Sequence, residues 1–246
     1  MTLNRIFPGL SAEHKDNVWT LTLDRPDKRN ALSAELVESL IKALDEAHQS
    51  SARLIVIKGA GKNFSAGFDF TGVEQQTEGD LLLRFVRIET LLQMLISSPA
   101  HTICFAHGRN FGAGVDLFAA CRQRVSAESA SFYMPGLKFG LVLGTHRLAQ
   151  LVGKEAAQRL LLRPDPFSSS QAHACGLVSQ MAEREAWDDL VLSAEAVCTG
   201  IETQTQERLF RVLTADHADA SLAALTRSAS APGIKERIAR YLARVK

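Results

Sequence analysis

The sequence lacks the cysteine pattern of a disulfide framework or a structural zinc site. Its four cysteines are far apart, and no two form a C-x-x-C pair; they are Cys104, Cys121, Cys175 and Cys198. Both kinds of site depend on closely and regularly spaced thiols. We therefore expect four buried free thiols and no metal centre.

The sequence also lacks a long apolar run. About 18 uncharged apolar residues are needed to cross a bilayer, and the nearest candidate, residues 81–96, contains Arg84, Arg87 and Glu89. That stretch is typical of an amphipathic helix. The first 16 residues include Glu13 and Lys15 and show no signal core. We expect a cytoplasmic protein with no membrane partner.

Charge of one sign is not in excess. The chain has 28 Lys and Arg against 27 Asp and Glu, a formal net charge of +1. Proteins that bind nucleic acid through their overall field carry a marked basic excess. We expect no nucleic-acid partner.

Complete nucleotide-binding and hydrolase motifs are absent. No Gly-x4-Gly-Lys-Ser/Thr loop and no Gly-x-Ser-x-Gly elbow occurs. Residues 59–64, Gly-Ala-Gly-Lys-Asn-Phe, follow an apolar run as a dinucleotide-binding loop would, but Phe64 stands where the third glycine is required. The fingerprint is incomplete, and a Rossmann-type oxidoreductase stays only as a rival hypothesis.

The elements that are present alternate between strand and helix. Residues 18–24 alternate in polarity and end at Pro26, and residues 53–59 are almost entirely apolar, as in a strand buried on both faces. Ser33 can cap a helix that runs to about residue 48, in which Leu36, Leu40, Ile41 and Leu44 fall on one face. We expect further helices at 80–97 and 113–121, one strand within 1–16, and strands at 101–106, 124–127 and 131–134 in one sheet. This order predicts an α/β fold with parallel strands.

From Gly153 onward the pattern is almost purely helical. The expected helices are 154–162, 169–175, 185–198, 203–213, 219–227 and 233–245. Apolar residues of this tail, such as Leu190, Leu192 and Val197, need a surface to cover on the same chain or on a neighbouring copy.

Two loops of small residues stand out within the α/β part. Residues 62–69 and 107–117 each form a turn that leads toward a helix, and the turn positions are Gly, Ala or Ser. A ligand can approach the main-chain N–H groups of such turns without meeting a side chain. Two amide donors that converge on one oxygen would stabilise the oxyanion or enolate of an ester or thioester.

Asp116 lies in the first turn of the helix after the second loop. Its carboxylate either complements the helix dipole or moves a proton at the atom next to the bound carbonyl. His107 and His146 are the imidazoles nearest the loops and are expected to be satisfied polar residues. Tyr133 is compatible with a core position or with a phenol that faces the site.

Six segments in unbroken order resemble one protein family. They are residues 25–33 (RPDKRNALS), 64–69 (FSAGFD), 108–117 (GRNFGAGVDL), 130–135 (ASFYMP), 144–153 (GTHRLAQLVG) and 172–178 (AHACGLV). In this order they are similar to the enoyl-CoA hydratase/isomerase (crotonase) family, over roughly residues 15–180.

This resemblance implies a crotonase-like spiral of repeated β-β-α units, with the core in residues 1–190 and a helical C-terminal region in 191–246 that packs on the core and on neighbouring subunits. It implies a homotrimer or homohexamer. The substrate would be an acyl-CoA thioester, and no separate cofactor is expected because coenzyme A is part of the substrate.

The resemblance also carries over site residues. The N–H groups of Ala66 and Ala113 would form the oxyanion hole, with Asp116 as the catalytic carboxylate. The residues expected to contact the substrate, including the adenine and pantetheine arm, are Lys28, Arg29, Ala31, Ala66, Gly67, Phe68 and Gly112. Lys28 and Arg29 are placed to meet the CoA phosphates.

Two departures from the family pattern bear on the reaction. Hydratases of the family use two glutamates around one water; here the first position is Asp116 and the second is Gly136, and the wall at residues 143–145 is shortened. A single carboxylate leaves the acid–base pair for hydration incomplete. We expect weak or absent hydratase activity, with isomerisation, decarboxylation or thioester cleavage open, although family isomerases commonly use the second position.

Two questions stay open from the sequence. The chain is either an enzyme or a catalytically silent acyl-CoA-binding subunit that kept the thioester pocket. Phe68, Phe111, Met134 and Phe139 are compatible with lining the acyl pocket and with simple core packing.

Overall fold

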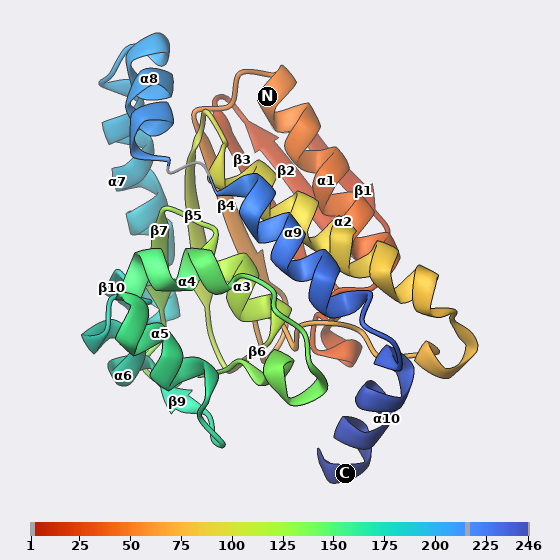
Figure 1. Cartoon of the computed structure of the whole chain (residues 1–246). Helices are drawn as coiled ribbons and strands as arrows, with labels where there is room; N and C mark the ends of the chain where they lie inside the picture. Colours follow the sequence, from red (N-terminus) through yellow and green to blue (C-terminus); the bar gives the residue numbers. More distant parts are fainter. Residues whose placement is uncertain (1–2, 215–216, 246) are drawn as a thin grey trace.

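The larger of two sheets is the centre of the molecule (Figure 1). The structure is a computed structural model that describes residues 3–214 and 217–245. The strand order is β1-β2-β3-β4-β5-β7-β10. The strands are β1 (Leu3–Phe7), β2 (Leu10–Lys15), β3 (Val18–Leu23), β4 (Leu54–Gly59), β5 (His101–Ala106), β7 (Gln123–Ser126) and β10 (Gln180–Met181). The first three are antiparallel and the rest are parallel, so the predicted α/β class is confirmed.

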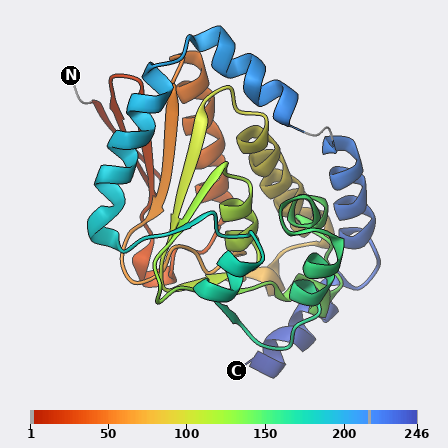
Figure 2. The same cartoon turned by 90° about the vertical axis from the view of Figure 1, so that its left-hand side faces the viewer.

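Helices cover both faces of this sheet. Helices α1 (Ala34–Gln49) and α2 (Glu78–Ile96) lie along one face, with α9 (Ala218–Ala229) packed on the outer side of α2, and α7 (Trp187–Thr199) lies on the other face (Figures 1 and 2). Leu36, Leu40 and Leu44 of α1 are fully buried, as their spacing predicts. The Leu36 N–H donates to the Ser33 hydroxyl at 3.2 Å, which is the expected cap.

A second sheet corrects one prediction. It consists of β6 (Arg109–Phe111), β8 (Ser131–Tyr133) and β9 (Phe167–Ser168). The strand predicted at 131–134 therefore does not belong to the sheet of residues 124–127, because β8 pairs with β6 instead of β7. The strand expected within residues 1–16 is present as two strands, because this segment folds back at Gly9 into β1 and β2.

The C-terminal half is mainly helical, as expected, with two short strands inserted. Its other helices are α4 (Thr145–Val152), α5 (Lys154–Leu161), α6 (Ser169–Ala174), α8 (Thr203–Leu213) and α10 (Ile234–Val245), and α3 (Ala113–Ala119) precedes them. Among the described residues, no helix has both the length and the apolar character that a bilayer span requires.

The two small-residue loops meet backbone to backbone. Ser65 and Asn110 form an isolated parallel bridge, and the Phe111 N–H donates to the Ser65 carbonyl at 3.0 Å. A Cβ atom added to Gly67 would overlap the Phe111 carbonyl and stand 3.1 Å from the Ala113 nitrogen. The predicted convergence of the two loops is therefore present, and it depends on glycine at position 67.

The rival dinucleotide-binding hypothesis lacks its structural context. A fingerprint of that class places a helix directly after its glycine loop. Here the described residues 60–72 form no helix, and Phe64 is fully buried beneath the loop.

We expect Gly67→Ala to cost more stability than a left-handed backbone alone explains. Gly67 and Gly72 have similar φ angles of +79° and +73°, but a Cβ at Gly72 meets nothing within 4 Å. Gly72→Ala should lower the free energy of unfolding by about 1–2 kcal/mol from backbone strain. Gly67→Ala should lower it by about 3 kcal/mol or more, because the loops must also separate. Urea unfolding of both variants measures the difference; equal losses would contradict the close contact.

Candidate functional site

A cavity of about 690 Å³ opens where the two loops meet. Its walls come from the turn η1 (Pro26–Lys28), the loop after β4, helix α2, the β6–α3 junction, the turn η3 (Pro135–Phe139) and α10. The structure brings together most residues that the sequence singles out: Lys28, Arg29, Ala31, Ala66, Phe68, Gly112, Ala113 and Asp116 all line the cavity. Gly67 does not line it and lies behind, against Phe111.

The main-chain donors in the first loop differ from the expectation. The Ala66 N–H donates to the Arg29 carbonyl at 2.9 Å. This donor is already engaged, which argues against its predicted role in an oxyanion hole. Arg29 supplies the acceptor because η1 ends in a left-handed residue, with Arg29 at φ 52°, that turns this carbonyl toward the loop.

Two other amides of the site have no such partner. Leu32 and Phe68 form a parallel β-bridge. The Leu32 N–H donates to the Gly67 carbonyl, and the Leu32 carbonyl accepts from the Asp69 N–H. In such a bridge the N–H of the central residue, here Phe68, points away from the paired strand. Among the described residues, neither the Phe68 N–H nor the Ala113 N–H, the first of helix α3, donates a hydrogen bond. The usable pair of donors is therefore Phe68 and Ala113. Because main-chain N–H groups alternate in direction along a paired strand, the sequence could have suggested the Phe68 N–H as a donor, but only if Leu32 had been known as the partner.

Asn30 holds the turn that carries the predicted phosphate-binding residues. Its fully buried side-chain amide donates to the carbonyls of Ala60 and Asn63, both at 2.9 Å. Lys28 and Arg29 stay exposed at the cavity mouth. Within the described chain neither forms an ion pair with an acid, since the salt bridges there join other residues.

Asp116 is buried inside the cavity wall, with 4% of its surface exposed. A Cβ added to Gly144 would overlap its carboxylate, so the carboxyl group rests directly on that glycine. Burial raises the pKa of Asp116 to about 8; nearby Arg147 offsets part of this rise and Glu89 adds to it. The Asp116 carboxyl therefore holds its proton at neutral pH and can exchange it near the physiological range.

A buried ion pair lies next to Asp116. Arg147 of α4 grips Glu89 of α2 with two hydrogen bonds, of 2.8 and 2.5 Å. Glu89 is fully buried and Arg147 is 7% exposed. Because the two charges neutralise one another, their fields at Asp116 largely cancel. In the sequence, Glu89 lies beside the apolar residues 81, 85, 88 and 92 of the same helix. A charged residue among buried apolar positions indicates a buried partner of opposite charge.

Position 136, where the family resemblance implies a second carboxylate, is a glycine. Gly136 lines the cavity, where a Cβ would stand 3.2 Å from the Leu141 carbonyl. The nearest hydroxyl groups in the wall belong to Tyr133 and Thr145. The Thr145 hydroxyl is buried and has no partner among the described residues. Tyr133 is half-buried, and it lines the cavity.

His107 and His146 do not line this cavity. Each has a hydrogen-bond partner, as expected, but the buried Nδ1 of His107 has none among the described residues, so His107 is satisfied only in part. His107 contacts the Gly61 carbonyl through Nε2 at 3.0 Å, and His146 contacts the Ser221 hydroxyl through Nδ1 at 3.3 Å. Among the described residues, no group of three His, Cys, Asp or Glu side chains could hold a metal ion.

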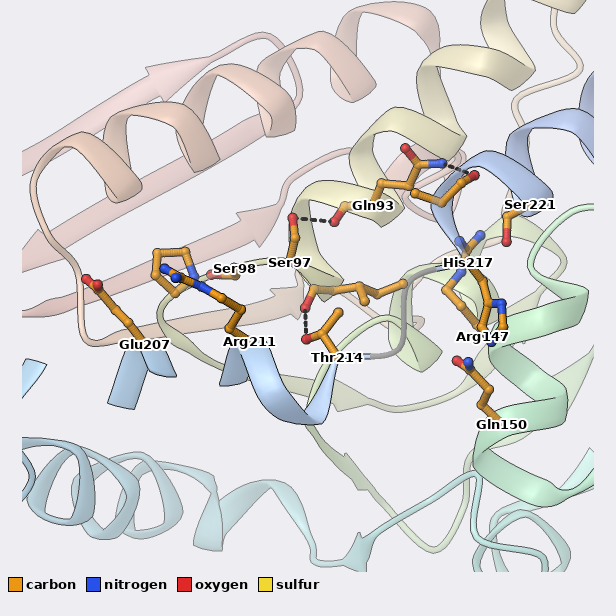
Figure 3. Close-up of a pocket in the computed structure, with 13 residues that line it drawn as sticks. Gln93, Ser97, Ser98, Arg147, Gln150, Glu207, Arg211, Thr214, His217 and Ser221 are labelled. Carbon is orange, nitrogen blue, oxygen red and sulfur yellow. Dashed lines mark hydrogen bonds between the residues drawn. The ribbon is translucent and has the colours of Figure 1, made fainter. Parts of the chain in front are cut away.

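A second cavity, of about 470 Å³, lies between α2, α4, α8 and α9. Figure 3 shows Arg147, Gln150 and His217 on one side of it and Glu207 and Arg211 on the other. It contains none of the predicted site residues, and the Asp116 carboxyl lines only the first cavity. The first cavity is therefore the candidate active site.

Comparison with known proteins gives one consistent result. A model of the enoyl-CoA hydratase/isomerase family matches residues 13–231. A probable enoyl-CoA hydratase of Bacillus subtilis is 33% identical over 203 residues, which cover 80% of this chain and 77% of that protein.

Solved structures agree with the fold. A crystal structure of a candidate enoyl-CoA hydratase/isomerase from Bordetella parapertussis superposes with a TM-score of 0.94 at 54% identity and covers 96% of this chain and 98% of that one. An enoyl-CoA hydratase structure from Bacillus halodurans superposes with a TM-score of 0.84 at 20% identity over 94% and 99% of the chains, which shows the fold alone. The crotonase-like fold predicted from the sequence is confirmed.

The Asp116→Asn variant should be more stable than the parent, and the difference in their free energy of unfolding should grow as the pH rises. Since the pKa of about 8 in the folded protein lies above the ordinary value of 3.8, the folded state binds more protons than the unfolded state between about pH 4 and 8. The free energy of unfolding of the parent therefore falls with pH in this window, whereas asparagine has no such penalty. We expect the variant to gain roughly 2–5 kcal/mol on the parent between pH 4 and pH 8. Urea unfolding at several pH values measures this gain.

Asp69→Asn is the matched control with the opposite sign. Burial raises the pKa of Asp69, but hydrogen bonds from Thr71 and Arg25 outweigh burial and hold it below the ordinary value. This variant should be less stable than the parent at neutral pH, and the deficit should shrink as the pH falls below about 4. A gain in Asp116→Asn that is independent of pH would contradict the proposed titration.

Proposed function

This chain belongs to the enoyl-CoA hydratase/isomerase family, and from that premise we propose that it processes acyl-CoA thioesters in the cavity beside Asp116. The Phe68 and Ala113 N–H groups hold the thioester oxygen as it gains negative charge. The observation that carries this proposal is the pair of amides without acceptors on two loops in backbone contact. Asp116 follows Ala113 by three residues on the same helix.

The reaction best supported is a shift of a double bond from the β,γ to the α,β position. Asp116 as carboxylate removes a proton from the α-carbon, and the electron pair moves toward the thioester oxygen between the two amides. The resulting carboxylic acid returns the proton to the γ-carbon, and the dienolate collapses to the conjugated thioester. The two carbons flank one atom, so a single carboxyl group can serve both.

Hydration requires a second group that transfers a proton. No second carboxylate among the described lining residues is suited to this task. Besides Asp116, the carboxylates that line the cavity are Asp27, which is exposed, and Asp69, which pairs with Arg25 at 2.8 Å. Gly136 occupies the position of the second glutamate. We therefore propose weak hydratase activity, in contrast to the names that related proteins carry.

The CoA arm lies across η1 in this proposal. Lys28, Arg29 and Arg109 line the mouth of the cavity as exposed cations, and charges of this kind attract phosphates. Ala31 and Phe68 flank the path inward. Coenzyme A enters as part of the substrate, and the proposed steps use no further cofactor.

Apolar side chains of the C-terminal helices support a homotrimer or homohexamer. Leu192 and Val197 of α7 are 62% and 63% exposed, and Val212 and Leu213 of α8 are 83% and 71% exposed. Where exposed apolar side chains form a contiguous patch, they mark a surface that associates with another protein. Sedimentation equilibrium should give three or six times 26.8 kDa, and Val212→Asp with Leu213→Asp should lower the mass; a parent of 26.8 kDa contradicts the assembly.

Turnover measurements test the proposed reaction. The β,γ-unsaturated thioesters but-3-enoyl-CoA and 5-phenylpent-3-enoyl-CoA should be converted to their conjugated isomers, and hydration of crotonyl-CoA should be slower by about 100-fold or more. Since Asp116 must lose its proton to act as the base, kcat/KM should rise with pH and level off near pH 8. Asp116→Asn should lose turnover and keep binding the thioester.

Ala113→Pro removes one amide donor without removing the loop. Position 113 is the first of helix α3, where proline is tolerated, and Gly112 before it has φ 49° and ψ −122°. This variant should lose about 10²–10³-fold in kcat, while Ala113→Gly, which keeps the N–H, should stay within a few-fold of the parent. Tight thioester binding with no turnover in the parent would favour the silent binding subunit, and efficient hydration of crotonyl-CoA would refute the single-carboxylate mechanism.

A further inference from the structure

Aromatic residues are concentrated in the acyl cavity. Seven of its 27 lining residues are aromatic, against 7% of the whole chain. They are Phe68, Phe70, Phe85, Phe111, Tyr133, Phe139 and Tyr241. The aliphatic lining residues are leucines, alanines and one methionine, and no valine or isoleucine of the described chain takes part. This enrichment points to a specific acyl group.

Four of these rings form a continuous surface, the aromatic wall, made of Phe68, Phe70, Phe139 and Tyr241. The edge of Phe70 meets Phe68 with ring centres 5.0 Å apart, and Phe70 meets Phe139 at 5.9 Å and 87°. Phe139 lies 5.2 Å from Tyr241 of α10. The wall thus runs from the loop that carries the Phe68 amide to the C-terminal helix.

The aromatic wall is held rigidly at both ends. Phe68 stacks on Phe85 at 4.5 Å, and the Arg84 guanidinium stands 4.0 Å from its ring centre. At the far end, Arg237 of α10 donates to the Phe139 carbonyl at 3.0 Å and to the carbonyls of Ala231 and Pro232 at 2.9 and 2.7 Å. These bonds tie α10, and Tyr241 with it, to the turn η3.

A second pair of rings lies in the same cavity. Phe111 of β6 and Tyr133 of β8 are paired in register, with ring centres 5.6 Å apart at 75°. Phe111 and Tyr133 line the same cavity as Tyr241. An acyl group inside the cavity meets ring faces and edges from both sets.

We propose that the acyl group this site takes is an aryl-substituted enoyl group rather than a long alkyl chain. This inference rests on the proposed function, because it assigns the substrate class of the same cavity. Aromatic rings attract one another in edge-to-face and offset arrangements at centre distances of about 4.5–7 Å. A phenyl ring also enters a rigid slot with few bonds to immobilise, whereas an alkyl chain loses the freedom of each of its bonds.

The test compares two saturated thioesters with ten acyl carbons each, 4-phenylbutanoyl-CoA and decanoyl-CoA, in calorimetric titrations of the full-length protein. Both lack the double bond and are not turned over by the proposed reaction. Transfer from water favours the more apolar decanoyl chain. If the aromatic wall selects the acyl group, the phenyl ester instead binds about tenfold tighter or more.

Three variants assign such a preference to the rings. Tyr241→Phe keeps the ring and should keep the preference; Tyr241→Leu and Phe70→Leu each remove one ring and should lower the ratio of affinities toward one, with thermal unfolding as a check that they fold. Decanoyl-CoA binding as tightly as the phenyl ester, or a ratio that both leucine variants leave unchanged, overturns this inference alone. If neither ester binds, the proposed function fails and this inference falls with it.

Discussion

The contact between two main-chain loops is the constraint on which the rest of the site depends. Where Ser65 and Gly67 meet Phe111 and Ala113, the backbones are too close for a side chain between them. The bridge from Leu32 uses the carbonyl of Gly67 and the amide of Asp69, so the amide between them, that of Phe68, is left free beside the first amide of α3. Unpaired donors in a buried wall are costly unless a ligand completes them, which is why this arrangement is evidence for a site.

The two buried carboxyl groups of the cavity, Asp69 and Asp116, have pKa values shifted in opposite directions. Asp69 is paired and hydrogen-bonded, and the pKa of its carboxyl is held down. Asp116 has no such bonds in the described chain, and burial brings the pKa of its carboxyl to about 8. The neutralised Glu89–Arg147 pair can hold α2 and α4 around it without forcing a charge on Asp116. Burial of the Asp116 carboxyl lowers the free energy of unfolding near neutral pH, and the same burial gives a group that exchanges protons in this range.

Family membership and the particular side chains around the cavity answer different questions about this protein. The family shared with the relatives and the fold favour chemistry at a thioester. The reaction and the acyl group that we propose depend instead on features of this chain, namely Asp116, Gly136 and the aromatic wall. A family name therefore restricts the substrate to a thioester class, whereas the reaction and the acyl group depend on a few side chains around the same pair of amides.

Much of this protein follows from local patterns in the sequence. The Ser33 cap and apolar spacing predicted α1, the uniform apolar run predicted β4, and six ordered segments predicted the family, because these signals reside in neighbouring residues. The assignment of β8 to the main sheet and of the Ala66 amide to the substrate did not follow the structure, since strand partners and amide acceptors come from distant parts of the chain. The sequence by itself determined most of the helices, the central strands, the family and the glycine at position 136. Only the tertiary structure decided which amides stay free, how deeply Asp116 is buried and that Tyr241 reaches the cavity, because each depends on contacts between segments far apart in the chain.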